Sequence, residues 1–354
     1  NPKQWRTIPT SDLLDEGYPV YGANGIIGYY SEYNHENPVV TVTCRGATCG
    51  SINITVPNAY ITGNAMCLDD VRSDIEMDYL YYCLKHYNFN NVISGSAQPQ
   101  ITRQGMDKIY ISIYGHDEQK KIVEKLKKVE NIINLRKQEI QLLDDFIKAR
   151  FVEMFGDENN SKNWNMVKIE DVANVQVGVV IKPSQYYTDK ENGVKAFRSL
   201  NIGEGFIKDI DWVYFTKEGH QKNSKSILKE NDLLIVRSGA PGTSCIVTKE
   251  YEGCNAIDII IAHPNCDKVN SYYLCTFTNM PHGKRQIDEG TGGAAQQHFN
   301  IGKYNKLQLI LPPIELQNQF ADFVHQVDKS KVAVQKALAE TQLLFDSLMQ
   351  QYFG

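Results

Sequence analysis

The chain has 354 residues, which is enough for two or three domains. Its 42% apolar and 22% charged residues are an ordinary core-forming mixture, which excludes wholesale disorder and collagen-like repeats. No run of about 18 uncharged apolar residues occurs, which excludes a membrane-spanning helix. The net charge is −5 and no segment is polybasic, so the charge does not by itself favour a nucleic-acid partner.

Residues 1–115 have the composition of short strands separated by turns: 21–25 has turn chemistry, and 39–43 is a β-branched run typical of a strand. The next segment, 116–156, is predicted to be one long helix, because its apolar residues recur in alternating steps of four and three. A narrow seam of this kind is typical of a coiled coil. The predicted packing residues are Ile122, Leu126, Val129, Ile133, Ile140, Leu143 and Ile147.

Residues 157–311 form a second strand-rich block, in which 232–236 is predicted to be a buried strand and 237–242 the turn after it. The last segment, 312–354, again has helical heptad spacing. Its predicted packing residues are Phe320, Val324, Val327, Val334, Leu338, Phe345 and Leu348.

The second half of the chain repeats the layout of the first. A shift of 198 residues places 95–156 on 293–354 without a gap, and Ile109, Ile111 and Ile113 then fall on Leu307, Leu309 and Leu311. That alternation predicts a half-buried strand before each helix. The predicted fold is therefore α+β, with two β-rich domains and two long helices arranged as a repeat. The alternative is two unrelated surface helices, each packed on its own domain.

The eight cysteines are scattered and include no C-x-x-C pair. This spacing fits neither a zinc site nor a disulfide scaffold, and it favours free thiols in a reducing compartment. The chain opens with NPKQW and has no basic-then-apolar leader, so we expect a cytoplasmic protein.

The sequence contains no recognisable catalytic motif. The phosphate-binding pattern G-x-x-x-x-G-K-[ST], the zinc motif H-E-x-x-H and the nucleophile pattern G-x-S-x-G are all missing, and the eight histidines are scattered. We expect no catalytic residue, no metal ligand and no cofactor in this chain.

The stretch that leads into each helix carries a family resemblance. The first copy reads SGSAQPQI at 94–101 and IYISI at 109–113; the second reads GAAQQHFNI at 293–301 and LQLILPPIE at 307–315. The first copy departs from the second at 114–116, where YGH replaces the two prolines. Two β-rich blocks that alternate with two long helices, each following a Gln-containing turn, resemble the specificity subunit of type I restriction–modification systems.

This resemblance implies target recognition domains at 1–115 and 157–311, a central helix at 116–156 and a C-terminal helix at 312–354, with the two helices packed antiparallel. Each domain would read one half of a bipartite double-stranded DNA site, and the helix pair would set the spacing. Two modification (methyltransferase) subunits would dock on the helices and bring S-adenosylmethionine, and restriction subunits can join them. The chain has no N-P-P-[FY] motif of an adenine methyltransferase.

Base edges are read by Arg, Asn, Gln, Ser or Thr on loops, because these side chains match the donors and acceptors of the bases. Arg45 and Arg237 are the strongest candidates, since each follows a strand in a similar sequence, VTCRGA at 42–47 and IVRSGA at 235–240. The other candidates are Thr43, Asn64, Ser96, Gln98, Gln100 and Arg103 in the first domain and Arg198, Ser199, Asn201, Ser238, Gln296, Gln297 and His298 in the second, with Lys284 and Arg285 as phosphate contacts.

Several of these residues also have a structural interpretation. Gln98 and Gln296 occupy equivalent places and could brace the chain before each helix, Asn64 could satisfy a turn, and Arg198 could pair with an acidic neighbour. Three other functions stay open: an enzyme with an unrecognised site, a scaffold without DNA whose coiled coil is a stalk, and a target-recognition fragment of a stand-alone methyltransferase.

Overall fold

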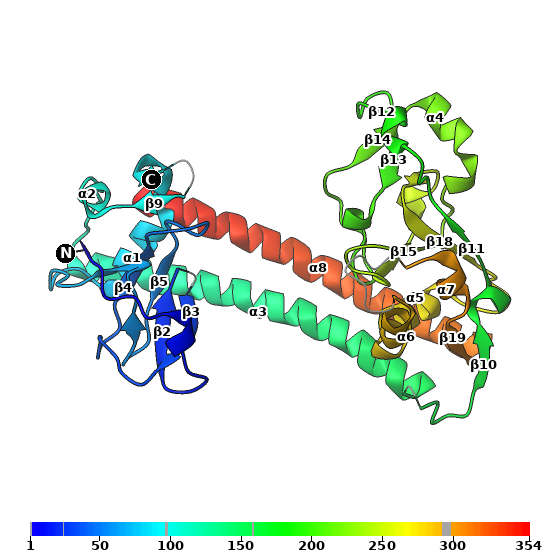
Figure 1. The fold of residues 1–354 in the computed structure, drawn as a ribbon, viewed down its shortest axis with the longest axis horizontal. Helices are drawn as coiled ribbons and strands as arrows, with labels where there is room; N and C mark the ends of the chain where they lie inside the picture. Colours follow the sequence, from blue (N-terminus) through cyan, green and yellow to red (C-terminus); the bar gives the residue numbers. More distant parts are fainter. Residues whose placement is uncertain (1, 24, 96–97, 158, 292–298) are drawn as a thin grey trace. The chain divides into compact units, whose positions relative to one another are not determined.

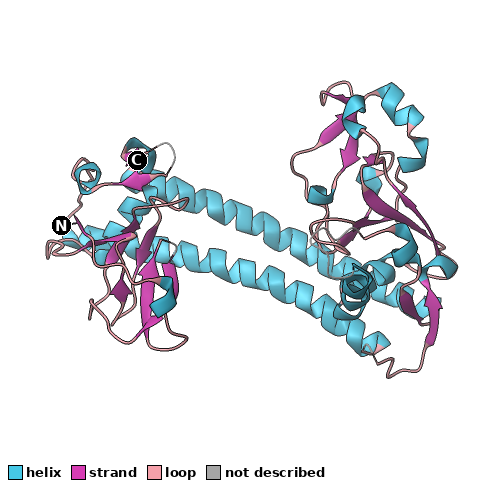
Figure 2. Cartoon of the chain, in the orientation of Figure 1, coloured by secondary structure: helices cyan, strands magenta, loops and turns pink. Residues whose placement is uncertain are grey.

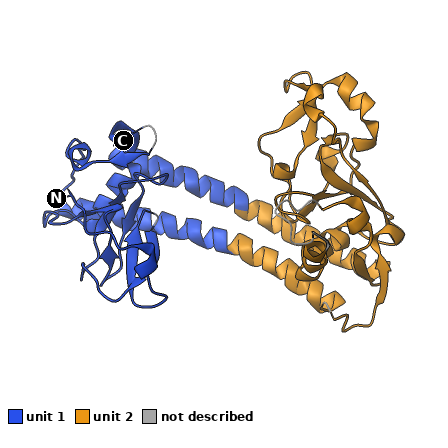
Figure 3. Cartoon of the chain, in the orientation of Figure 1, with its two compact units in different colours: residues 1–138, 335–354 blue, residues 139–334 orange. Residues whose placement is uncertain are grey.

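The computed structural model describes all residues except 1, 24, 96–97, 158 and 292–298. The chain divides into two compact units: unit 1 is Asn1–Gln138 with Gln335–Gly354, and unit 2 is Glu139–Val334 (Figure 3). The helices α3 (His116–Phe155) and α8 (Ile314–Phe353) have 40 residues each and contribute to both units (Figure 1). Each unit therefore combines one β-rich block with the start of one long helix and the end of the other.

The described residues of unit 1 form three small sheets (Figure 2). All four residues of its central strand β4 are buried, which explains the β-branched run VTVT. The four-stranded sheet has the order β1 (Pro2–Lys3), β7 (Ala65–Leu68), β4 (Val40–Thr43), β5 (Ile52–Ile54); the three-stranded sheet has the order β3 (Gly25–Tyr30), β2 (Tyr18–Gly22), β6 (Tyr60–Ile61); and β8 (Ile93–Ser94) pairs with β9 (Gln100–Ile101).

Helix α1 (Met77–His86) covers the four-stranded sheet of unit 1, and the short helix α2 (Arg103–Met106) follows β9. Leu80 and Leu84 of α1 pack with Val40 and Val42 of β4 in one core cluster. The side chain of Thr102 caps α2 by accepting a hydrogen bond from the backbone N–H of Gly105 at 3.1 Å. The core of unit 1 thus lies between this sheet and α1.

Unit 2 also contains three sheets, held by a core that includes the ends of both long helices. The sheet orders are β11 (Ala173–Val177), β18 (Ile259–Pro264), β15 (Leu233–Val236), β16 (Ser244–Ile246); β12 (Tyr187–Thr188), β14 (Val213–Phe215), β13 (Val194–Phe197), β17 (Asn255–Ala256); and β10 (Asn165–Lys168) with β19 (Gln308–Leu311). Its shorter helices are α4 (Lys217–Lys222), α5 (Ser271–Asn279), α6 (Pro281–Thr291) and α7 (Ile301–Asn305).

The two units repeat one topology, as the sequence predicted. The order β1-β7-β4-β5 in unit 1 matches β11-β18-β15-β16 in unit 2, and β3-β2-β6 matches β14-β13-β17 with the same parallel and antiparallel pairings. The cap of α7 also repeats that of α2, since Asn300 accepts from the backbone N–H of Lys303 at 3.0 Å. The predicted α+β repeat of two β-rich parts and two long helices is confirmed.

In unit 1 the two long helices run antiparallel. Lys125 donates to the hydroxyl of Tyr352 at 3.2 Å, while Arg136, further along α3, donates to the carbonyl of Ala337, which lies earlier in α8. The apolar seam between them is buried or half-buried, as the heptad pattern predicted. It contains Ile122, Leu126, Val129, Ile133, Leu338, Phe345 and Leu348, together with Met349, which the pattern missed.

The helix segments of unit 2 are antiparallel as well. Asp144 pairs with Lys331, and Phe155, at the end of α3, lies 5.4 Å from Phe320 near the start of α8 (ring centroids). Phe320, Val324 and Val327 are buried, and Ile140, Leu143, Ile147 and Val334 are half-buried. The predicted seam residues of unit 2 are therefore all buried or half-buried, as a packed seam requires.

A buried glutamine fixes the start of each long helix. Gln119 accepts from the backbone N–H of Glu76 at 2.9 Å and donates to the carbonyls of Asp74 at 2.9 Å and Tyr114 at 2.8 Å. Gln317, 198 residues later, accepts from Asn270 N–H at 2.9 Å and donates to the carbonyls of Lys268 and Pro312 at 3.3 and 2.8 Å. Each side chain ties the turn before α1 or α5 to the long helix.

One predicted strand is wrong. Residues 307–311 include strand β19, which pairs with β10, but 109–113 are not a strand. In the described part of unit 1 no strand lies beside 109–113, so this segment has no ladder to join. Ile109 and Ile111 instead pack against the core cluster under α1, which explains their apolar alternation.

Glu130 of α3 provides a pH-sensitive link to α1 in unit 1. Its carboxylate accepts from the Tyr82 hydroxyl at 2.8 Å and from Lys85 at 2.9 Å. Burial raises the pKa of Glu130, but these two hydrogen bonds outweigh it, so the pKa lies below its ordinary value of 4.5. Since the folded-state pKa is lowered, the stabilisation is present above pH 4.5 and is lost as the pH falls through the folded value.

We expect Glu130→Gln to lower the free energy of unfolding by about 1 kcal/mol at pH 7, because it removes the charge from two partly exposed hydrogen bonds. The difference should shrink below pH 4.5, where the wild-type carboxyl becomes protonated. Thermal unfolding of the wild type and of Glu130→Gln, from pH 7 to below pH 4.5, measures this difference in stability.

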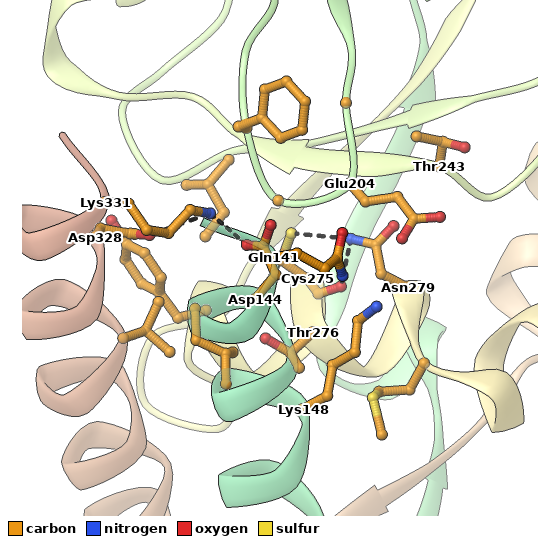
Figure 4. Close-up of a pocket in the computed structure, with 18 of the residues that line it drawn as sticks. Gln141, Asp144, Lys148, Glu204, Thr243, Cys275, Thr276, Asn279, Asp328 and Lys331 are labelled. Atoms are coloured by element: carbon orange, nitrogen blue, oxygen red, sulfur yellow. Dashed lines mark hydrogen bonds and ion pairs between the residues drawn. The ribbon is translucent and has the colours of Figure 1, made fainter. Parts of the chain in front are cut away.

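The repeat supplies a control with the opposite sign. Asp328 occupies the position of Glu130 in unit 2, but with Thr276 and Asn279 it lines a cavity of about 470 Å³ (Figure 4). Burial raises the pKa of Asp328 despite the charges of Lys331 and His325. Because its ionised form is disfavoured in the folded state, Asp328→Asn should increase stability at pH 7. If the free energy of unfolding changed in the same direction in Glu130→Gln and Asp328→Asn, the opposite roles assigned to these two carboxylates would be contradicted.

Candidate nucleic-acid interface

Three loops of unit 1 meet beyond the end of β4. The Cys44 N–H donates to the carbonyl of Asn64 at 3.0 Å, and the Ile101 N–H donates to the carbonyl of Cys44 at 3.0 Å. Arg45 forms an isolated antiparallel bridge with Gln100. The segments 44–46, 62–64 and 98–101 therefore form one surface, which we call the β4 loop surface.

The β4 loop surface carries one arginine, Arg45, whose positive charge is not paired by the described residues. Its side chain is exposed, and it has no hydrogen bond or ion pair with any residue that the structure describes. Gln98 and Gln100 are exposed beside it. A guanidinium and two amides can donate to and accept from base edges, so these three candidates form a chemically suitable set.

The other candidates of unit 1 are less available. Thr43 is buried, and its hydroxyl donates to the carbonyl of Ala23 at 3.0 Å, so its prediction as a DNA contact is wrong: it holds the β2–β3 turn against β4. Asn64 is half-buried. Arg103 is exposed at the first position of α2 but already takes part in an interaction. Ser96 lies outside the described residues.

A glycine shapes the corresponding loop in each unit. Gly50 has a φ of +92°, and a Cβ there would lie 2.9 Å from Phe89; Gly242 has a φ of +85°, and a Cβ there would lie 2.6 Å from Ile287. Both positions need a left-handed backbone and a close approach that only glycine allows. The loop after β4 and the loop after β15 are thus equivalent.

Arg237, the second of the two strongest candidates, is paired. Its guanidinium forms an ion pair with Asp258, and its Nε donates to the carbonyl of Phe299 at 3.2 Å; the side chain is only 17% exposed. In this structure Arg237 is engaged within unit 2, and its contact with bases stays a prediction. It is a positioning residue that fixes the loop after β15 to Phe299, the residue that follows 292–298.

The backbone hydrogen bonds show why the two arginines differ. The carbonyl of Cys44 accepts from Ile101 N–H, and the carbonyl of Arg237 accepts from Phe299 N–H, so Arg237 is equivalent to Cys44. Ser238 is then the equivalent of Arg45, and the similarity of VTCRGA to IVRSGA is offset by one residue. Ser238 is half-buried and takes part in an interaction.

The remaining candidates of unit 2 divide in a similar way. Arg198 pairs with Asp211 at 3.0 Å, as its structural interpretation proposed, and Ser199 is half-buried beside it. Asn201 is fully buried and accepts from the backbone N–H of Arg198 at 2.9 Å, so it holds a turn and cannot contact DNA. Lys284 pairs with Glu204.

Arg285 is exposed and takes part in an interaction, and Gln296, Gln297 and His298 lie outside the described residues.

Sequence analysis missed Lys182. Its side chain is exposed and forms no hydrogen bond or ion pair with the described residues, while its backbone, with a φ of +44°, accepts a hydrogen bond from the Gln185 N–H at 3.2 Å. The neighbouring Val179 accepts from Asp258 N–H at 3.2 Å, which brings the 179–182 loop close to the Arg237–Asp258 pair. Ile181 beside it is 80% exposed. The sequence signal that could have found it is a lysine between an apolar run and a proline, in GVVIKP at 178–183.

Among the described residues, no helix has both the length and the apolar composition that crossing a membrane requires. The two long helices reach the length but carry charged residues along their exposed sides.

Comparison with solved structures supports the fold. A type I restriction–modification S subunit from M. genitalium is similar over 100% of this chain and 93% of its own, with a TM-score of 0.60 and 15% identity. A structure described as showing complex assembly and conformational transition of the type I R-M system covers 99% of this chain and 94% of its own, with a TM-score of 0.56 and 15% identity.

Sequence relatives agree. The type I restriction enzyme MjaVIII specificity subunit of Methanocaldococcus jannaschii is 22% identical over 73% of this chain and 67% of its own. The EcoBI specificity subunit of Escherichia coli is 19% identical over 97% of this chain and 75% of its own. The sequence profile of the type I restriction modification DNA specificity domain matches residues 3–144 and 161–341, and it describes a DNA specificity domain, not a catalytic subunit. The chain belongs to the family of type I restriction modification DNA specificity domains.

Proposed function

We propose that the chain reads a bipartite site in double-stranded DNA, with one half-site for each unit. The observation that carries this proposal is the repeat: β4 and β15 occupy the same place in the same sheet order, and each is followed by a loop with a close-packed glycine. Two equivalent loop surfaces on one chain suit two short sequences separated by unread base pairs. Unit 1 would read through Arg45, Gln98 and Gln100, and unit 2 through the loops at 179–182 and 238–240.

The long helices would set the gap between half-sites and bind two modification subunits. Large apolar side chains are exposed along them, which supports a protein partner. They are Ile132, Leu135, Leu343 and Leu344 in unit 1 and Leu142, Phe146, Val152 and Val332 in unit 2. The modification subunits would carry S-adenosylmethionine. They would also supply the phosphate contacts that a chain of net charge −5 lacks. Restriction subunits could join, and the complex would act in the cytoplasm.

Selection from randomised duplex DNA, with and without modification subunits, tests this function. We expect two short half-sites at a fixed separation. One heptad inserted into each long helix adds about 10 Å, so the gap should lengthen by about three base pairs while the half-sites stay unchanged.

Three outcomes would contradict the proposal. Absence of any sequence preference in both conditions would favour a scaffold without DNA. Methyl transfer by the chain alone would favour a stand-alone methyltransferase. Altered half-sites after the heptad insertions would contradict the spacing role of the helices.

A further inference from the structure

Unit 1 contains a converging set of side chains at the end of its four-stranded sheet opposite to Arg45. The ligand atoms of His35, Cys67 and Asp69 all lie within 4.8 Å of one another. Cys67 is fully buried in β7, and the side chains of His35 and Asp69 are only 10% and 14% exposed. Cys67 and Asp69 are two residues apart along an extended segment, which places both on one face.

Asn34 fixes the proton on the ring of His35. The Asn34 Oδ1 accepts from the Ile61 N–H at 2.9 Å, and its Nδ2 donates to the Ile61 carbonyl at 3.0 Å, so the amide orientation is determined by the backbone. The Nδ1 of His35 lies 2.7 Å from this Oδ1. Since Oδ1 can only accept, Nδ1 must carry a proton.

The other ring nitrogen, Nε2, lies near the Asp69 carboxylate and the Cys67 sulfur, which are both possible ligands for a cation. His35 Nε2 lies 3.1 Å from Asp69 Oδ1. With the proton on Nδ1, Nε2 of the neutral ring is an acceptor, and two acceptors at this distance need a cation between them. The sulfur of Cys67 lies within 4.8 Å of both of these atoms, so a single cation can contact all three.

We propose that His35 Nε2, Cys67 Sγ and Asp69 Oδ1 bind one zinc ion. This nitrogen, sulfur and oxygen set is one that Zn²⁺ accepts, and tetrahedral bonds of 2.0–2.3 Å place ligand atoms roughly 3.3–3.8 Å apart, so only small shifts are needed. The hydrogen bond from Nδ1 to Asn34 is the outer support that metal-bound histidines usually have.

The fourth ligand would be water. A cavity of about 580 Å³ is lined by His35 and Asp69, so a metal ion and water can reach these two ligands from it. Burial and the neighbouring Asp69 raise the pKa of the Cys67 thiol, whereas a hydrogen bond from Trp5 lowers it. Binding would break the S–H bond, form an S–Zn bond and release the proton to water, without oxidation or reduction.

This proposal departs from the expectation, drawn from scattered cysteines, that the chain has no metal ligand. The three ligands come from a strand and from a loop 32 residues earlier, which no spacing motif covers. The equivalent strand of unit 2 pairs with β15 as β7 pairs with β4, so Ile261 replaces Cys67 and His263 replaces Asp69. His263 contacts Asp232 but lacks a sulfur, which makes it a matched control.

The test is a zinc titration of the full-length, chelator-treated, reduced protein in competition with a chromophoric chelator. We expect one equivalent bound by the wild type, a loss of affinity of about 100-fold or more in Cys67→Ser and His35→Gln, and no change in His263→Gln or Cys275→Ser. Far-ultraviolet circular dichroism of each variant checks that it is folded.

Cobalt(II) gives a readout that needs no variant. Thiolate coordination in the wild type should produce a sulfur-to-cobalt charge-transfer absorption together with the visible bands of a tetrahedral ion. Absence of this absorption, or equal zinc binding by wild type and Cys67→Ser, would overturn the proposal.

Discussion

Replacement of Gln317 by leucine is expected to lower the free energy of unfolding by about 3–5 kcal/mol. The side chain is fully buried and has hydrogen bonds to Asn270, Lys268 and Pro312. Leucine has a similar volume but leaves one N–H and two carbonyls of the backbone without partners, and each unsatisfied group costs about 1–3 kcal/mol. Denaturant unfolding of the full chain measures the loss.

Because each unit has its own buried glutamine, we expect each replacement to destabilise only the start of the long helix in its own unit. Gln119 has the same three hydrogen bonds in unit 1, to Glu76, Asp74 and Tyr114. Hydrogen exchange should therefore show loss of protection at the Asn270 amide in Gln317→Leu and at the Glu76 amide in Gln119→Leu. In each variant the amide of the other unit should keep its protection.

Gln342→Leu is the matched control, because Gln342 is exposed on α8 and its side chain bonds only to Asp346 among the described residues. We expect a change within about 0.5 kcal/mol. Equal stability of Gln317→Leu and Gln342→Leu would show that the buried glutamine does not hold the helix start.

The helices and the repeat could be predicted because their signals are local and periodic. The seam residues follow heptad steps, and burial of Ile122, Leu126 and Phe320 agrees with that spacing. Strands β4 and β15 are β-branched or apolar runs that need no knowledge of their neighbours. The segment 109–113 has the same alternation of apolar residues as 307–311. A strand also needs a neighbouring strand for its backbone hydrogen bonds, and the alternation does not reveal whether one is present.

The interface was less predictable because availability depends on residues far away in the sequence. Arg45 and Arg237 occur in similar local sequences, yet Asp258, 21 residues after Arg237, pairs with it, while Arg45 has no such partner among the described residues. Thr43 has suitable chemistry but is buried, and its hydroxyl donates to the carbonyl of Ala23, 20 residues earlier; Asn201 is buried as well, and it accepts from the N–H of Arg198 within a local turn. The set His35, Cys67 and Asp69 was missed for the same reason.

Arg45→Ala is expected to weaken binding to the DNA site by about 1–3 kcal/mol, which is about 5- to 150-fold in affinity. The side chain is exposed and unpaired among the described residues, and the backbone of Arg45 is held beside Gln100 by a β-bridge, so its guanidinium is available to the O6 and N7 atoms of a guanine. Selection from randomised duplex DNA should show loss of preference at one position of one half-site, with the other half-site unchanged.

A lysine at position 45 separates base reading from charge. Arg45→Lys keeps the charge but loses the planar fork that a bidentate contact needs. If Arg45 reads a base, Arg45→Lys should lose the preference almost as fully as Arg45→Ala. If it only neutralises a phosphate, Arg45→Lys should bind like the wild type, and Arg45→Ala should weaken all sequences equally and reduce the salt dependence of binding by about one phosphate contact.

Arg72→Ala controls for the loss of one positive charge from unit 1. Arg72 follows β7, which is antiparallel to β4, so it lies at the end of the sheet opposite to Arg45, where it pairs with Asp74 at 2.6 Å. Since an exposed paired arginine far from the β4 loop surface should not contact bases, Arg72→Ala should leave both half-sites intact. Equal losses for Arg45→Ala and Arg72→Ala would mean that unit 1 contributes charge and not sequence reading, and the β4 loop surface would then not be the reading surface.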